Sequence, residues 1–143
     1  HEWVLNHHMT SYHPFNINGN IMENKTPKEI HDEAVAESKK AVNKFITAWR
    51  KENPDHQEKY GGMHEPLCCG FAWVKVRPAT TPFARFLKKE GIVRYPSHSG
   101  GYDIYNPSDW VGQSIDVKEI GAEAYKEILR KYGITAYAMS RLD

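Results

Sequence analysis

Apolar residues recur with the spacing of an amphipathic helix over residues 27–52. One stripe of this helix would carry Ile30, Ala34, Ala41, Val42, Phe45 and Trp49. Thr26 and Glu29 have the spacing of a capping box, and Pro27 suits the first helical position. Asn53-Pro54 predicts the end, because a residue before proline avoids the helical region. This segment is the longest helix that the sequence predicts.

Two shorter helices are predicted further along the chain. Residues 82–90 follow a Thr-Thr-Pro start and end before Gly91, a favoured residue after a helix. Residues 115–132 follow Ser114, and we expect either Ser114 or Asp116 to cap that helix. Its buried stripe is expected to contain Val117, Ile120, Ala124 and Ile128.

A period of two predicts the main strand at residues 70–76. One face would carry Ala72, Val74 and Val76, and the other Phe71, Trp73, Lys75 and Arg77. Further strands are expected at 102–105 and 134–139. The segment 92–95 is expected to pair with 102–105 as a hairpin, because the residues 96–101 between them are rich in turn formers.

The order of these elements predicts a single α+β domain over residues 26–143, with a small mixed sheet and about three packed helices. Residues 1–25 show no period and are expected to form an irregular arm. The two histidines before Met9 suggest a tag or vector scar, so residues 1–8 do not enter the fold prediction. Residues 55–68 are expected to form a polar loop. Strands joined through helices favour parallel pairing, which would gather their carboxyl ends at one edge.

That edge is the predicted ligand site, because open parallel sheets bind ligands outside the carboxyl ends of their strands. Two helix N-termini would begin beside it, and these favour anions. The predicted site residues are Arg77, Thr81, Tyr105, Gln113, Ser114, Ser140 and Arg141. The expected ligand is an anionic small molecule or a nucleotide, with a host protein as the alternative partner. If Arg77 and Arg141 lie at opposite ends of the sheet, this site is wrong and a protein-interaction role becomes the better expectation.

Composition adds limits to this picture. The net charge of +1 over 143 residues gives no general attraction to nucleic acid, which is therefore a less favoured partner. No run approaches the ~18 apolar residues of a membrane span, so we expect no membrane partner. Cys68 and Cys69 are adjacent and do not suit a relaxed disulfide. We expect both to be reduced, small buried hydrophobes in a protein of a reducing compartment.

Candidate chemistry is sparse. The segment from His64 to Cys69 holds soft ligands, but their spacing matches no zinc pattern, so no metal is expected. His31 is expected to face outward on the first helix. The sequence has no G-x-x-x-x-G-K-S/T phosphate loop and no G-x-S-x-G elbow, so it does not identify a cofactor. The enzyme alternative is a small hydrolase or transferase that acts on a phosphate-containing substrate at the same edge. Its candidate titrating groups are Asp143, Asp116 and His98, which lie in three separate segments.

The aromatic face of strand 70–76 allows two interpretations. Aromatic residues that alternate with basic ones on an open sheet can stack nucleobases, which makes single-stranded nucleic acid an alternative ligand. Tyr137, Met139 and Arg141 would continue that face on the last strand. The favoured interpretation is that helix 27–52 covers the face and buries it with Phe45 and Trp49.

Three segments of the sequence, residues 62–74, 112–119 and 136–143, together resemble a family of small proteins encoded by tailed bacteriophages, which has no assigned function. They include Gly70-Phe71-Ala72-Trp73, Gly112-Gln113-Ser114 and Ser140-Arg141-Leu142-Asp143. Cys68 stands where this resemblance leads us to expect an aromatic residue, which argues against a functional cysteine pair. The resemblance implies a phage accessory protein that acts in the cytoplasm of an infected bacterial host.

Overall fold

The computed structural model describes residues 24–143 and confirms the α+β fold class. The elements, in chain order, are α1 (Pro27–Glu52), α2 (His56–Tyr60), β1 (Gly70–Val76), α3 (Pro82–Lys89), β2 (Tyr102–Tyr105), α4 (Ile115–Lys131) and β3 (Ala136–Leu142). The short helix α2 was not predicted and lies inside the expected loop 55–68. Most of the predicted arm 1–25 lies outside the described residues.

The three strands form one sheet in the order β2-β1-β3, and both pairings are antiparallel. The predicted mixed sheet with parallel neighbours is therefore wrong. The chain turns back between β1 and β2 through α3 and a loop, so these two strands pair antiparallel. The preference for parallel strands holds only for β2 and β3, which are joined through α4. They run in the same direction, but β1 lies between them.

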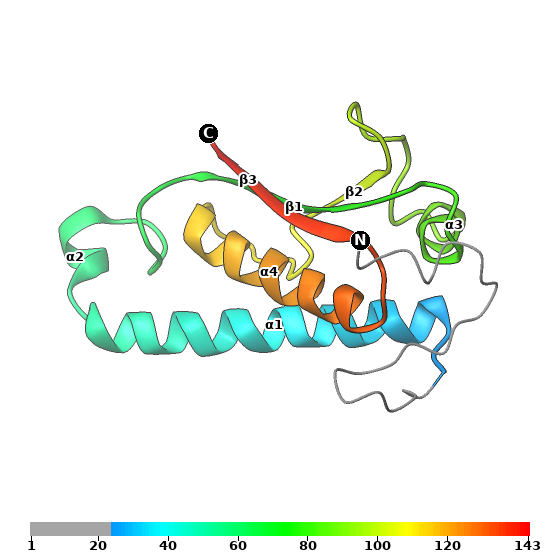
Figure 1. The fold of residues 1–143 in the computed structure, drawn as a ribbon. Coiled ribbons are helices and arrows are strands. Elements are labelled where there is room, and N and C mark those ends of the chain that lie inside the picture. The colour runs from blue at the N-terminus through cyan, green and yellow to red at the C-terminus, as the bar shows by residue number, and fades with distance from the viewer. Residues whose placement is uncertain (1–23) are drawn as a thin grey trace.

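All the long helices lie on one side of the sheet (Figure 1). Helix α4 packs against β1 and β3, and α1 packs along the far side of α4. Ala72, Val74 and Val76 point toward α4 and are at most 1% exposed. Phe45 and Trp49 of α1 pack near Val117 in a second cluster. The expectation that α1 covers the aromatic face is therefore wrong, because α1 is separated from the sheet by α4.

Helix α4 is buried on two sides, because α1 packs against one side and the sheet against the other. Its buried residues are Ile115, Val117, Lys118, Gly121, Ala122, Tyr125 and Leu129. Of the predicted stripe only Val117 is among them. The contact with α1 is close at Gly121, whose carbonyl accepts a 2.7 Å hydrogen bond from Ser38 Oγ. A Cβ atom at Gly121 would come within 2.7 Å of Ser108. A side chain at this position would therefore push neighbouring segments apart.

Of the predictions made from helix ends and turns, some are confirmed and others are wrong. The capping box of Thr26 and Glu29 is present at the start of α1, as predicted. The predicted strand 92–95 is wrong: these residues form a turn and an irregular segment beside the sheet. Both cysteines are free and exposed, so the expectation that they are buried is also wrong. They lie in the loop just before Gly70, where β1 begins.

No helix in residues 24–143 is long and apolar enough to cross a bilayer.

His31 faces the helix layer rather than solvent, which corrects its expected outward orientation. Its Nδ1 lies 2.8 Å from the hydroxyl of Tyr125 on α4, and its ring also contacts Phe86 of α3. Burial lowers the pKa of the His31 imidazole from its ordinary value of 6.5, with a smaller opposing effect from Asp32. The folded protein therefore favours the neutral ring.

We predict that this histidine makes the fold less stable in mild acid. As the pH falls through 6.5, the unfolded chain takes up a proton that folded His31 resists, so the free energy of unfolding decreases. Urea unfolding between about pH 7.5 and 5 should show this slope, and His31→Gln, which keeps a hydrogen-bonding group, should reduce it. Equal slopes in both proteins would show that His31 is not responsible.

Candidate functional site

The structure separates the predicted site residues into two groups at opposite ends of β1. Arg77 follows the last residue of β1, where its backbone N–H donates to the carbonyl of Thr135 at 3.2 Å. Arg141 pairs with Phe71 near the other end. Six residues of strand, about 20 Å at ~3.3 Å per residue, separate these positions. The expected anion site between the two arginines is therefore wrong.

Most of the other predicted residues gather at the end of β1 where Arg141 lies. β3 ends there, β2 ends opposite Trp73 in the middle of β1, and Ser114 forms a bridge with Cys69 just before β1. This group consists of Tyr105, Gln113, Ser114, Ser140 and Arg141. Thr81 remains at the far end with Arg77 and caps α3, since its Oγ1 accepts from Ala84 N–H at 3.2 Å. Antiparallel pairing thus brings together part of the predicted set.

The N-terminus of α4 already holds an anion from the same chain, the carboxylate of Glu65. Glu65 accepts hydrogen bonds from the backbone N–H groups of Gln113 at 2.9 Å and Ser114 at 3.1 Å. It also accepts from Trp110 Nε1 at 2.8 Å, and it is only 8% exposed. A negative group at this position suits the positive end of the helix dipole. This helix start is therefore occupied and is not open to a ligand.

Gly112 completes this arrangement. A Cβ atom there would lie 2.1 Å from Glu65 Oε1 and 2.6 Å from Trp110 Nε1. Ser114, predicted as the cap, makes no capping hydrogen bond with its side chain. The carboxylate of Glu65, from a distant loop, instead accepts from the N–H groups of Gln113 and Ser114 just before the first helical residue, Ile115, and sequence spacing alone did not reveal this contact.

Within residues 24–143, no helix covers the face of the sheet opposite α4, and this face carries the aromatic residues. In the register of the strands, Tyr105, Trp73 and Met139 form one row across it. Asp103, Lys75 and Tyr137 form the next row. Tyr105 is 63% exposed, Met139 is 40% exposed and Phe71 is 39% exposed. We call these residues, with Arg77 and Arg141, the outer face.

Cationic side chains lie over two of the aromatic rings. The Arg141 guanidinium lies 5.2 Å from the centre of the Phe71 ring. The guanidinium of Arg77 lies 5.6 Å from the Tyr137 ring, with Arg130 at 5.5 Å. Such contacts hold the guanidinium groups beside the rings while leaving their charge near solvent. Each end of the outer face thus combines an arginine with an aromatic surface.

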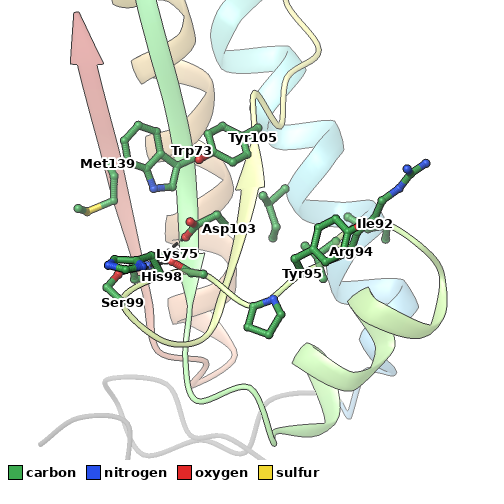
Figure 2. Close-up of a pocket in the computed structure, with 14 residues that line it drawn as sticks. Trp73, Lys75, Ile92, Arg94, Tyr95, His98, Ser99, Asp103, Tyr105 and Met139 are labelled. Atoms are coloured by element: carbon green, nitrogen blue, oxygen red, sulfur yellow. Dashed lines mark hydrogen bonds and ion pairs between the residues drawn. The ribbon is translucent and has the colours of Figure 1, made fainter.

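A hollow of about 670 Å³ lies between the outer face and the segment 92–99 (Figure 2). Trp73, Tyr105 and Met139 lie together along one part of it. The Trp73 and Tyr105 rings have centroids 5.5 Å apart and an angle of 36° between their planes. Figure 2 shows His98 and Ser99 near Lys75 on one side of the hollow, and Arg94 and Tyr95 near Ile92 on the other. The hollow therefore offers apolar ring surfaces on the strand side and polar groups on the loop side.

Lys75 links the loop at Ser97 and Gly100, which borders this hollow, to the sheet. Its ammonium group donates to Ser97 Oγ, to the carbonyl of Gly100 at 3.4 Å and to Asp103 Oδ1 at 3.1 Å. An ammonium has three N–H donors, so all of them are accounted for. Its side chain is 9% exposed, and Asp103 balances its charge. Lys75 is therefore a structural tether, and it has no donor left for a ligand.

The arrangement favours stacking and hydrogen bonding over chemistry. The candidate titrating groups of the enzyme alternative do not meet: His98 borders the hollow, whereas Asp143 lies beside Cys69 at the other end of β1. Asp116 lies in the first turn of α4, on the helix side of the sheet. Among residues 24–143, no group of three or more His, Cys, Asp or Glu side chains could hold a metal ion.

Sequence reasoning missed the hollow and the role of Glu65. The hollow forms because the segment 92–99 does not pair with the sheet. Pro96 was the one sequence signal against such pairing, because proline cannot donate to a strand ladder. Glu65 lies before Pro66 in a loop, and nothing local indicates that it caps a helix nearly fifty residues later. The alternation of Phe71, Trp73 and Tyr137 with basic residues was visible in the sequence.

We predict that removal of the Glu65 carboxylate destabilises the fold. Glu65→Ala leaves the N–H groups of Gln113 and Ser114 and the indole N–H without their acceptor, which should lower the free energy of unfolding by about 2–3 kcal/mol. Denaturant unfolding measures this loss. Glu58→Ala, at an exposed carboxylate of α2, is the control and should change stability by less than about 0.5 kcal/mol. A loss no larger than that of the control would contradict the capping role.

A second prediction concerns the pair of Lys75 and Asp103. Lys75→Met should lower stability by about 3 kcal/mol, because it leaves the Asp103 carboxylate unpaired in a mostly buried place. The double variant Lys75→Met with Asp103→Leu should recover most of this loss, since neither charge then lacks a partner. Thermal unfolding of the single and double variants tests the coupling. Strictly additive losses would show that the pair is not coupled.

This chain matches no protein-family model, no curated protein and no solved structure.

Proposed function

We propose that this protein binds single-stranded nucleic acid on the outer face of its sheet. The observation that carries the proposal is that every long helix lies on the other side, which leaves a sheet face of aromatic and basic residues open. The sequence-based preference for a covered face rested on α1, and α1 packs on α4 instead.

The aromatic residues support stacking of bases. Trp73 and Tyr105 lie side by side, and Tyr105 is 63% exposed. Base stacking on an aromatic side chain contributes about 1–3 kcal/mol per base, and every nucleobase has a flat surface for it. The hollow beside these rings adds space for a base that leaves the row, with hydrogen-bonding groups of Ser99 and His98 at its rim.

The arginines support a chain-like ligand rather than a compact anion. Arg77 and Arg141 lie about 20 Å apart along β1, with aromatic rings between them. A single phosphate cannot reach both, whereas a strand of several nucleotides can contact one at each end and stack between them. A mononucleotide in the hollow has weaker support, because the charge of Lys75 is already paired with Asp103.

A host protein is the second candidate ligand for this face, and the separated arginines favour it as well. Trp, Tyr, Phe, Met and Arg are the residue types enriched at the centres of protein interfaces. Met139 and Phe71, which are 40% and 39% exposed, suit such a partner. The phage resemblance does not distinguish the two ligands, and we place the proposed activity in the cytoplasm of an infected bacterium.

Binding of a fluorescent single-stranded oligonucleotide of about 12 bases, as RNA and as DNA, tests the main proposal. Tyr105→Ala should weaken binding about 5- to 150-fold, which corresponds to the loss of one stacked base at ~1–3 kcal/mol. Tyr60→Ala is the matched control. Tyr60 is 60% exposed, close to Tyr105, but it lies on α2 away from the sheet. This control should bind as the wild type does.

Salt dependence gives a second measure of the same proposal. Arg77→Gln and Arg141→Gln should each reduce the slope of log affinity against log salt by about 0.7, the value for one phosphate contact on a single strand. No binding to either oligonucleotide at millimolar concentration would refute the proposal and leave the protein partner. Equal weakening by Tyr105→Ala and Tyr60→Ala would show that binding does not use the outer face.

A further inference from the structure

β3 is an edge strand whose outer edge has no partner in residues 24–143. It pairs with β1 on one side only, and its residues from Met139 to Leu142 are exposed. Natural proteins usually protect such edges with proline, lysine or a bulge. The seven residues of β3 contain no proline and no lysine, and all seven pair with β1 in an unbroken register. Among the described residues, this edge is therefore regular and has no strand beside it.

The hydrogen bonds at the ends of β3 determine which backbone groups face outward. Arg77 N–H donates to Thr135 at 3.2 Å, and Asp143 N–H donates to Cys69 at 3.1 Å. Pairs of this kind alternate along an antiparallel ladder, so the odd-numbered residues of β3 bond to β1. The N–H and C=O groups of Ala138, Ser140 and Leu142 therefore point to the open edge.

The C=O of Ala136 confirms this alternation. It points outward and accepts a hydrogen bond from Arg130 Nε at 2.9 Å. Arg130 thus closes the edge at its beginning, and the open stretch runs from Ala138 to the end of the strand. An extended segment laid beside it would continue the ladder.

A groove of about 260 Å³ lies directly beneath this stretch, between β3 and α4. It is lined by Glu119, Ala122, Glu123, Ala138, Met139 and Ser140. Residues directly opposite each other in a ladder lie on the same face. The side chains of an added strand opposite Ala138 and Ser140 would therefore point toward the groove. Those between them would point to the outer face beside Met139.

Charge identifies the kind of segment that fits. The groove carries the carboxylates of Glu119 and Glu123, and the Glu123 side chain is 55% exposed. Lys126 balances part of this charge, but it also contacts Glu127. Lysine or arginine at alternate positions of an added strand would neutralise the groove. A second copy of β3 is disfavoured, because two-fold pairing about Ser140 would bring the acidic grooves of both copies together.

We propose that the open edge of β3 binds an extended, basic peptide segment of a partner protein by strand addition. Backbone hydrogen bonds to Ala138, Ser140 and Leu142 would supply the register. Basic side chains at every second position would enter the groove at Glu119 and Glu123. This site uses the edge of β3 and the groove beside α4, and it does not depend on nucleic-acid binding.

A seven-residue peptide that alternates lysine with valine, blocked at both ends, tests the proposal by NMR titration of the full chain labelled with ¹⁵N. We expect shifts at the amides of Ala138 and Ser140, and slower hydrogen exchange at Ser140. The same peptide with glutamate in place of lysine should not bind. Glu119→Gln combined with Glu123→Gln should weaken binding about tenfold, the effect of two partly exposed charge pairs.

Two further changes isolate the backbone pairing. Ser140→Pro removes an outward N–H and should abolish binding. Ser140→Ala keeps that N–H and removes only the side-chain hydrogen bond to Glu119, so it should bind more tightly than Ser140→Pro. If Ser140→Pro fails to fold, a lysine–valine peptide that is N-methylated at its central residues gives the same test on the wild-type protein, and it should not bind.

Several outcomes would overturn the proposal. These are equal binding of the lysine and glutamate peptides, undiminished binding of the N-methylated peptide, and shifts confined to Trp73 and Tyr105. Association of the protein with itself through β3 in the absence of peptide would also overturn it, because the edge would then be an interface between copies. Loss of oligonucleotide binding in Tyr105→Ala has no bearing on this site, so the two proposals can fail separately.

Discussion

The packing of α4 between α1 and the inner face of the sheet is the contact on which the rest of the structure depends. Tyr125 and Leu129 are fully buried there, and Ala72, Val74 and Val76 of β1 close the other side. Burying an aliphatic or aromatic side chain of this size contributes about 1.5–3 kcal/mol, so this layer supplies much of the core. Both long helices are used on this side, and the opposite face of the sheet remains open as a result.

The same arrangement explains why the expected anion site fails. A helix N-terminus in this fold is a favourable place for a negative charge, and the chain places its own Glu65 there. Lys75 likewise has an internal partner in Asp103. The two arginines of the outer face lie beside aromatic rings at its two ends, so they do not converge on one compact anion.

The sequence predicted the elements well and their arrangement poorly, for a physical reason. Capping residues and the alternation in β1 are local signals, and they located α1, α4 and the main strand to within a few residues. The direction of pairing is not local: both β2 and β3 pair antiparallel with β1, and this places Arg77 and Arg141 at opposite ends of β1. The Glu65 cap also joins distant segments. By contrast, the alternation of aromatic and basic residues on the outer face could be predicted from the spacing of residues within β1 and β3 alone.

The two proposed sites share β3, which gives them a physical connection. Met139 and Arg141 point to the outer face, while the backbone of Ser140 between them faces the open edge. A strand added at that edge would extend the sheet and place its own side chains beside Met139. It would thus widen the surface on which bases stack, or narrow it if those side chains are bulky. Any such effect is reciprocal, since a peptide that changes oligonucleotide affinity has its own affinity changed by the same factor. The side chains that a partner presents at those outward positions would therefore determine whether the two ligands support or exclude each other.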